Sequence, residues 1–158
     1  AYGTGTNGWT HSTQGALNYS PQNGMRKIAT VNPGVTVINI GINDAVGGTP
    51  DADFRTAVGT MIERSAGVGS LTDAVICTMN PLDTASVPQV TQDAFNLAIR
   101  EVAAANSIAV FDINALLGGT FAAMSAGGWA FDALHPNEAG YAKIAAEQKK
   151  LFDMILAA

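Results

Sequence analysis

The segment Val35 to Asp44, VTVINIGIND, decides the fold class of this chain, because a β-branched run is followed at once by glycine, amide and carboxylate residues. Such a run is typical of a strand that lies inside a parallel sheet, and the residues after it are typical of a turn. Two similar runs, Ala74 to Thr78 and Ile108 to Ile113, also end in turn residues. The sequence therefore predicts three short strands, each buried on both faces.

Helical patterning separates and follows these strands. The predicted helices are Gln14 to Ala29, Ala52 to Ala66, Thr91 to Asn106 and Pro136 to Leu156. The last helix carries a stripe at the spacing of three and four residues that indicates a core-facing surface. Its members are Tyr141, Ile144, Ala145, Gln148, Leu151, Phe152 and Ile155. Strands that alternate with helices predict a three-layer α/β fold with a right-handed parallel sheet, and residues 67–70 and 118–128 are typical of loops.

The composition is that of one acidic domain. A chain of 158 residues, 47% of them apolar, is long enough to bury a core, so residues 1–158 are predicted to form a single domain. A net charge of −5 without clustered basic residues argues against a nucleic-acid partner, and no apolar stretch reaches the roughly 18 residues of a membrane span. Cys77 is the single cysteine and lies in an apolar run, which predicts a buried structural thiol. Low charge with abundant Gly, Ala, Thr and Asn favours a secreted or virion-associated protein.

Polar and turn residues gather where the predicted strands end. They are Gly41, Asn43, Asp44, Asn80, Asp83 and Asn114. Because ligands bind an open parallel sheet at the carboxyl ends of its strands, a site is predicted there. His135 follows Asp132 by three residues, so the carboxylate can accept from one ring nitrogen and leave the other for proton transfer. A helix-capping role for this pair is the alternative interpretation.

Two motifs, GIND at Gly41 to Asp44 and DALHP at Asp132 to Pro136, resemble two of the four signature blocks of the SGNH, or GDSL, hydrolase superfamily. The resemblance covers almost the whole chain and implies a flavodoxin-like α/β sheet and an ester hydrolase. It implies that His135 is the general base, that Asp132 orients it, and that the Asn43 side chain donates to the oxyanion. A turn residue that closes the strand is the alternative role of Asn43.

The nucleophile has no match in this resemblance. The family's first block, a Gly, Asp, Ser turn at the end of the first strand, has no counterpart in the chain. Its second block, a glycine whose N–H points at the oxyanion, matches Gly8 in TNGWT best, with Gly5 and Gly3 close by. Ser12 is the nearest serine, but it follows a glycine-rich loop, which favours a helix N-cap role. His11 is expected at the rim of the site.

The resemblance also implies a missing part of the sheet, because the chain would begin inside the family's second strand. In the doubly wound order the first strand is central and pairs with two neighbours. Its loss would remove several buried side chains worth about 1.5 to 3 kcal/mol each, against about 5 to 15 kcal/mol for a whole domain. We therefore expect residues 1–158 to fold poorly and to be inactive alone, with an additional upstream or separate polypeptide segment supplying the first strand and the serine.

Two tryptophans lie close to predicted site residues. Trp9 follows Gly8, and Trp129 precedes Asp132 by three residues. An aromatic face beside a catalytic centre is a common platform for a sugar ring or an acyl chain, so both are candidate substrate-binding residues, with core packing as the alternative. Phe121 and Phe131 are expected to close the core beneath the histidine loop.

The sequence thus predicts a serine esterase that removes acetyl or similar acyl groups, with a carbohydrate ester favoured over a long lipid. No metal or cofactor is implied. The alternative is a non-catalytic glycan-binding or structural module with a degenerate hydrolase fold. A phosphate-binding or nucleotide-binding flavodoxin-like domain is disfavoured, because no strand is followed by a glycine-rich phosphate loop.

Overall fold

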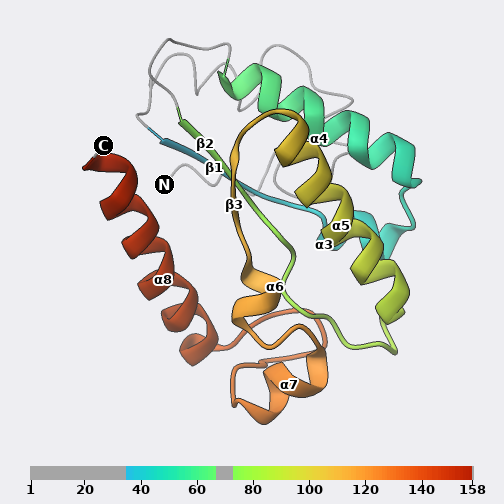
Figure 1. The fold of residues 1–158 in the computed structure, drawn as a ribbon. Coiled ribbons are helices and arrows are strands. Elements are labelled where there is room, and N and C mark those ends of the chain that lie inside the picture. The colour runs from blue at the N-terminus through green and yellow to red at the C-terminus, as the bar shows by residue number, and fades with distance from the viewer. Residues whose placement is uncertain (1–34, 67–72, 158) are drawn as a thin grey trace, which may run out of the picture.

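The computed structural model describes residues 35–66 and 73–157, and the predicted α/β architecture is confirmed there (Figure 1). Three strands, β1 (Val35–Asn39), β2 (Asp73–Cys77) and β3 (Ala109–Phe111), form a parallel sheet in the order β1-β2-β3. In this register Ile38 pairs with Ile76, and Cys77 pairs with Phe111. The central position of β2 explains why residues 74–77 are all buried.

Two long helices cover one face of the sheet and a third lies over the other (Figure 1). The helix α4 (Asp51–Ala66) connects β1 to β2, and α5 (Gln89–Ala105) connects β2 to β3. Because parallel crossovers are right-handed and the strand order runs in one direction, both connecting helices fall on the same face. The helix α8 (Glu138–Leu156) follows the last strand on the opposite face.

The main core lies between the sheet and the pair α4 and α5. Phe54 of α4 and Phe95 of α5 have ring centroids 4.5 Å apart, and both side chains are buried. Ile99 and Ala103 of α5 are also buried in this core. Aromatic and branched side chains of this size supply most of the apolar area that a small domain removes from water.

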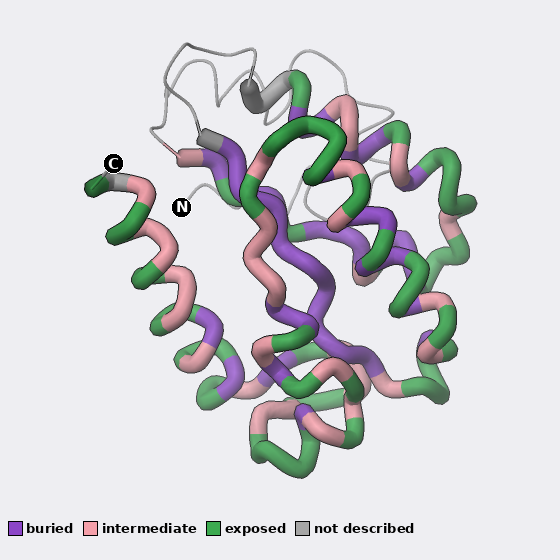
Figure 2. Tube along the Cα trace, viewed as in Figure 1, coloured by how far each residue is buried: buried purple, intermediate pink, exposed green. Residues whose placement is uncertain are grey.

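The face under α8 is packed more thinly, as the green and pink tube of α8 shows in Figure 2. Cys77 of β2 is fully buried there, which confirms the predicted structural thiol, and burial raises its pKa to about 12. The core-facing stripe predicted for α8 is correct in part. Ile144 is buried, and Tyr141 is 54% exposed. The remaining members are half-buried, except the exposed Ala145: they are Gln148, Leu151, Phe152 and Ile155.

Burial of the edge strands also differs from the prediction. Thr36 and Ile38 of β1 face the main core, but Val37 and Asn39 on the other side are exposed. Two-sided burial is therefore correct for β2 and wrong for the edge strands: α8 leaves one side of β1 uncovered, and no residue of β3 is fully buried. Phe131 is 76% exposed, so it does not close the core as expected. Phe121 does pack, half-buried, against the cluster beneath α8.

Three short helices were not predicted: α3 (Ile42–Gly47), α6 (Ile113–Leu116) and α7 (Phe121–Ala126). Helices of four to six residues are too short to show a 3.6-residue repeat, so only their caps mark them. Asp112 accepts from the Ala115 N–H at 3.0 Å, and Thr120 accepts from the Ala123 N–H at 3.2 Å. The loop predicted over residues 118–128 therefore contains α7.

The long helices begin within two residues of the expected positions. The helix predicted over residues 14–29, the loop at 67–70 and the expectations about the first strand fall outside the described residues. Across the two described ranges, no helix combines the length and the apolar character that crossing a bilayer requires.

Candidate active site

The first part of the site is the turn between β1 and α3. Gly41 has a φ of 118° and caps the N-terminus of α3, a backbone conformation that a side chain would strain. A Cβ at this position would also lie 3.0 Å from the Met79 side chain. The turn places Asn43 in the first turn of α3 with its side chain exposed. The glycine and amide of the GIND motif therefore have separate roles, one in the turn and one at the surface.

Asp44, the last residue of the same motif, is fully buried. Its carboxylate accepts a hydrogen bond from the Thr49 hydroxyl at 3.3 Å, and its carbonyl accepts the Thr49 N–H at 2.9 Å. These bonds hold the segment that follows α3 against the start of the helix. Asp44 therefore braces the loop that follows α3.

The second part of the site is the pair Asp132 and His135. Nδ1 of His135 lies 3.0 Å from both carboxylate oxygens of Asp132. The Asp132 Oδ1 also accepts the backbone N–H groups of Leu134 at 2.8 Å and His135 at 2.7 Å. The Leu134 N–H first, and then the His135 ring, lower the pKa of Asp132 below its usual value. An ionised carboxylate only accepts, so Nδ1 carries the proton and Nε2 is left as an acceptor.

The loop that carries His135 is closed on itself and on α8. The Phe131 N–H donates to the His135 carbonyl at 2.9 Å, and the Asn137 N–H donates to the Trp129 carbonyl at 2.7 Å. The Asn137 side chain caps α8 by accepting from the Gly140 N–H at 3.0 Å, so neither Asp132 nor His135 is the cap. The Asp132–His135 pair is thus free of a capping role at this helix.

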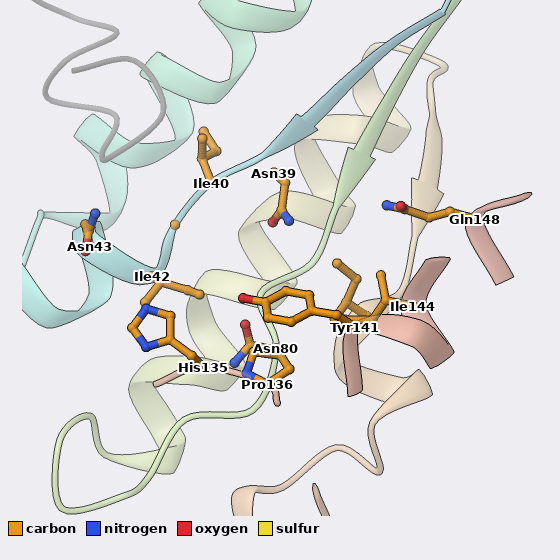
Figure 3. Close-up of a pocket in the computed structure, with 12 residues that line it drawn as sticks. Asn39, Ile40, Ile42, Asn43, Asn80, His135, Pro136, Tyr141, Ile144 and Gln148 are labelled. Carbon is orange, nitrogen blue, oxygen red and sulfur yellow. The ribbon is translucent and has the colours of Figure 1, made fainter. Parts of the chain in front are cut away.

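Gly41 and Asn43 of the first part and His135 of the second line one cavity of about 260 Å³ at the carboxyl end of β1 (Figure 3). Its walls are formed by Asn39, Ile40, Gly41, Ile42, Asn43, Asn80, Ile113, His135, Pro136, Tyr141, Ile144 and Gln148. Figure 3 draws His135 and Asn43 near one end and Gln148 at the other. The structure therefore brings the predicted base and the predicted oxyanion donor to the same hollow.

The cavity also includes residues that the sequence did not indicate as site residues. Asn39 is the last residue of β1, and Tyr141 and Gln148 are seven residues apart on α8. That spacing, two turns on one helix face, was assigned to the core stripe instead. The available signal in the sequence was a tyrosine six residues after His135, near the start of the predicted last helix.

The remaining predicted site residues lie elsewhere. Trp129 does not line the cavity; its ring lies 4.3 Å from the Lys143 ammonium, and a Cβ on Gly127 would lie 2.7 Å from it. Gly8 and Trp9, with the nearby Ser12 and His11, fall outside the described residues. Within residues 35–66 and 73–157, His, Cys, Asp and Glu side chains form no group of three suited to a metal ion.

Solved structures with similar folds include two esterases and one lipolytic protein. A peptidoglycan O-acetylesterase superposes with a TM-score of 0.71 at 17% identity, over 85% of this chain and 41% of the other. A member of the lipolytic G-D-S-L family from Veillonella parvula gives 0.69 at 21% identity, over 90% and 75%. A carbohydrate esterase of family 3 from Talaromyces cellulolyticus gives 0.67 at 19% identity, over 87% and 66%. At such identities the likeness concerns the fold.

The chain spans less than half the length of the first of these proteins. A comparison with curated protein sequences found no match. Residues 2–143 match the GDSL-like lipase/acylhydrolase family, a range that contains both the GIND and the DALHP motifs. By this match, and by a fold shared with G-D-S-L proteins, the chain belongs to the GDSL-like lipase/acylhydrolase family.

Proposed function

We propose that this protein is a serine ester hydrolase that removes acetyl or similar small acyl groups from a carbohydrate ester. The observation that carries the proposal is the His135–Asp132 pair, whose ring lines the same cavity as Asn43. A base with a fixed tautomer beside a neutral amide donor is the arrangement that acyl transfer requires.

The proposed reaction passes through a covalent acyl-serine. Nε2 of His135 accepts the proton of a serine hydroxyl while the serine oxygen bonds to the ester carbonyl carbon. Asp132 stabilises the imidazolium, and the Asn43 amide donates to the negatively charged oxygen. The intermediate collapses, the imidazolium returns the proton to the leaving alcohol, and water then releases the acyl group by the same route.

The serine is proposed to come from a segment outside residues 1–158, upstream or separate. The support for this is that the chain's sequence contains no Gly, Asp, Ser turn, although His135 and Asn43 line one cavity. The same segment is proposed to supply the strand that the family pattern places beside β1. The side chains of Val37 and Asn39 are exposed next to that position.

The preference for a small acyl group rests on the size and lining of the cavity. A volume of about 260 Å³ is below the range of about 300 to 1,000 Å³ that is usual for drug-sized ligands. Three asparagines and a glutamine lie among its walls, so polar contacts are available along its length. One protein of similar fold is a peptidoglycan O-acetylesterase and another is a carbohydrate esterase. Both favour a carbohydrate as the alcohol half of the ester.

A fluorophosphonate probe, which bonds covalently to an activated serine, tests the proposal directly. The chain 1–158 and the same chain with any residues that its gene encodes upstream of Ala1 are incubated with the probe and mapped by mass spectrometry. We expect the label on an upstream serine in the longer protein. A label on Ser12 would contradict the proposed source of the serine. No label on either protein would exclude a serine encoded upstream and favour a glycan-binding module.

Variants of the labelled protein then assign the roles. Asp132→Asn is expected to reduce kcat by about 10⁴-fold, because the imidazole takes the wrong tautomer. Asn43→Ala is expected to reduce kcat by about 10² to 10³-fold, the usual effect of losing one oxyanion donor. Asn106→Ala, which removes an exposed amide bonded to the Val102 carbonyl, is the matched control and should leave kcat unchanged. Unchanged kcat in Asn43→Ala would remove the oxyanion role.

A further inference from the structure

The loop of residues 79–83, which follows β2, is held by buried amide side chains of α5. Gln92 is completely buried, and its Oε1 accepts the Leu82 N–H at 2.8 Å. Its Nε2 donates to the carbonyls of Leu82 at 2.8 Å and Val87 at 2.7 Å. One turn further, the buried Asn96 accepts the Met79 N–H at 2.8 Å. These two residues fix the backbone on both sides of Asn80.

The burial of the Gln92 amide has a cost that its three hydrogen bonds offset. A buried amide without partners costs a few kcal/mol, so a glutamine in an apolar core is explained by the loop that it holds. The Gln92 amide pairs with both backbone groups of Leu82, as a neighbouring strand would. The loop of residues 79–83 is therefore a fixed part of the core and not a mobile surface turn.

Asn80 connects this fixed loop to the loop that carries His135. Its side chain is 8% exposed and lies at the cavity wall, between the ring of Tyr141 and Pro136 in Figure 3. Both hydrogens of its amide are used: one is donated to the Pro81 carbonyl at 3.0 Å and the other to the Leu134 carbonyl at 2.9 Å. Leu134 is the residue directly before His135.

A second bond joins the same two loops. The Asp83 N–H donates to the Ala133 carbonyl at 2.8 Å. Two consecutive carbonyls of the histidine loop, those of Ala133 and Leu134, are thereby bonded to the loop that α5 fixes. The Asp132 carboxylate accepts the N–H groups of Leu134 and His135. Both the N–H groups and the carbonyl groups of the backbone next to the imidazole are therefore hydrogen-bonded.

We propose that Asn80 is a positioning residue for His135: its amide holds the Leu134 carbonyl and so keeps the imidazole paired with Asp132 in the Nδ1–H tautomer. The catalytic consequence rests on the proposed function of His135 as general base. Without this bond the loop can shift by part of an ångström, and Nδ1 then loses its symmetric contact with the carboxylate. Displacements of this size are sufficient to lower the rate of an enzyme by about 10²-fold.

The test measures the tautomer, which needs no catalytic activity. Long-range proton–nitrogen NMR spectra distinguish Nδ1–H from Nε2–H, and His135→Gln identifies which of the two histidine signals belongs to residue 135. We expect the wild-type ring to be in the Nδ1–H form. We also expect a scalar coupling between the Asn80 Nδ2 and the Leu134 carbonyl carbon, which reports the hydrogen bond between them. The absence of that coupling in the wild-type protein would overturn the proposal without any variant.

Variants then test the cause. Asn80→Leu, of similar size but without donors, is expected to raise the Nε2–H population of His135 by about tenfold, as the loss of one hydrogen bond allows. Asn106→Leu, which removes an exposed amide far from the loop, is the matched control and should leave the tautomer unchanged. Asn80→Ala serves if the leucine variant does not fold. An unchanged tautomer in a folded Asn80 variant contradicts the proposal.

The activity measurement separates this inference from the proposed function. In an active protein, Asn80→Leu is expected to lower kcat by about 10 to 100-fold with little change in KM, and to shift the histidine limb of the pH profile. If the wild-type protein has no esterase activity but the tautomer changes as expected, the proposed function fails and the positioning role stands. If activity is present and neither tautomer nor pH profile moves, the positioning role fails alone.

Discussion

The two faces of the sheet differ in how completely they are packed, and the proposed chemistry lies on the less complete one. On the α4/α5 face, Phe54, Ile62 and Ile99 are almost fully buried. On the α8 face, Ile144 is buried, but Tyr141 and Met154 are more than half exposed. The α4/α5 face therefore supplies most of the apolar stabilisation, and the α8 face leaves room for a cavity lined by His135.

The difference also explains why the buried amides lie where they do. Gln92 and Asn96 extend from the well-packed face to the loop after β2, and Asn80 connects that loop to the histidine loop. A site on a thinly packed face needs support from a rigid element, because loops alone do not hold a side chain within the tolerance that catalysis requires. The position of the histidine loop is therefore fixed by side chains of α5, which lies on the opposite face of the sheet.

The largest expected effect is on the α4/α5 face. Phe54→Ala should lower the free energy of unfolding by about 3 to 5 kcal/mol, because its ring is fully buried and packs against Phe95. Ile144→Ala on the α8 face should cost about 2 kcal/mol, since that side chain borders the open cavity. Urea unfolding measures both. Equal losses would show that the two faces are packed alike.

The turn at the end of β1 should be the next most sensitive position. Gly41→Ala is expected to cost about 1 to 3 kcal/mol, since φ is 118° and the new Cβ meets Met79. Gly47→Ala is the matched control: it lies in the same short helix with nothing within 4 Å of the new Cβ. That control should be neutral or stabilising by about 0.5 to 1 kcal/mol. A stable Gly41→Ala protein would contradict the strained turn.

Asp112 joins the two faces, and its charge predicts an acid-dependent effect. Burial alone raises its pKa, but hydrogen bonds from the Ala115 N–H, Arg100 and Thr78 outweigh burial, so the pKa of Asp112 is lowered. A carboxyl whose folded pKa is depressed stabilises the fold above its unfolded value of about 3.9, and this contribution is lost as pH falls through the folded pKa.

Asp112→Asn should therefore lower the free energy of unfolding by about 1 kcal/mol at pH 7, with the difference from wild type shrinking toward pH 3. Asp153→Asn, which removes an exposed pair with Lys149 on α8, should change it by less than about 0.5 kcal/mol at any pH. Denaturant melts across this pH range provide the comparison. A constant difference for Asp112→Asn would rule out the charge as the cause.

The smallest effect is expected at the exposed end of α8. Met154→Ser should change the free energy of unfolding by less than about 0.5 kcal/mol, because the side chain is 65% exposed. In a protein of this size the melting temperature should move by no more than about 2 °C. A loss near 2 kcal/mol would mean that Met154 is covered in solution, and the contrast between the faces would be smaller.

The long elements were predictable from the sequence because local patterns specify them. β-branched runs marked β1 and β2, and the apolar spacing of Phe95, Ile99 and Ala103 marked α5 and its buried face. The short helices were not predictable in this way. A single side-chain cap at Asp112 starts α6, and that signal is also common in turns.

The pairing of Asp132 with His135 was predictable because three residues separate them and one tight turn brings them together. The convergence of His135 and Asn43 was implied by family resemblance and by the rule that parallel strands end at one edge. The role of Asn80 was beyond the sequence, since its bond to Leu134 joins residues that are 54 positions apart.

By itself, then, the sequence determined the alternation of strands and helices and the local geometry of the acid and histidine pair, because both are recorded in patterns of residues that lie close together in the chain. Only the tertiary structure decided which side chains of α8 are covered, that Tyr141 and Gln148 border the cavity, and that Gln92, Asn96 and Asn80 connect α5 to the histidine loop. Burial and hydrogen bonding across distant segments depend on how elements pack, and no local pattern in the chain records that packing.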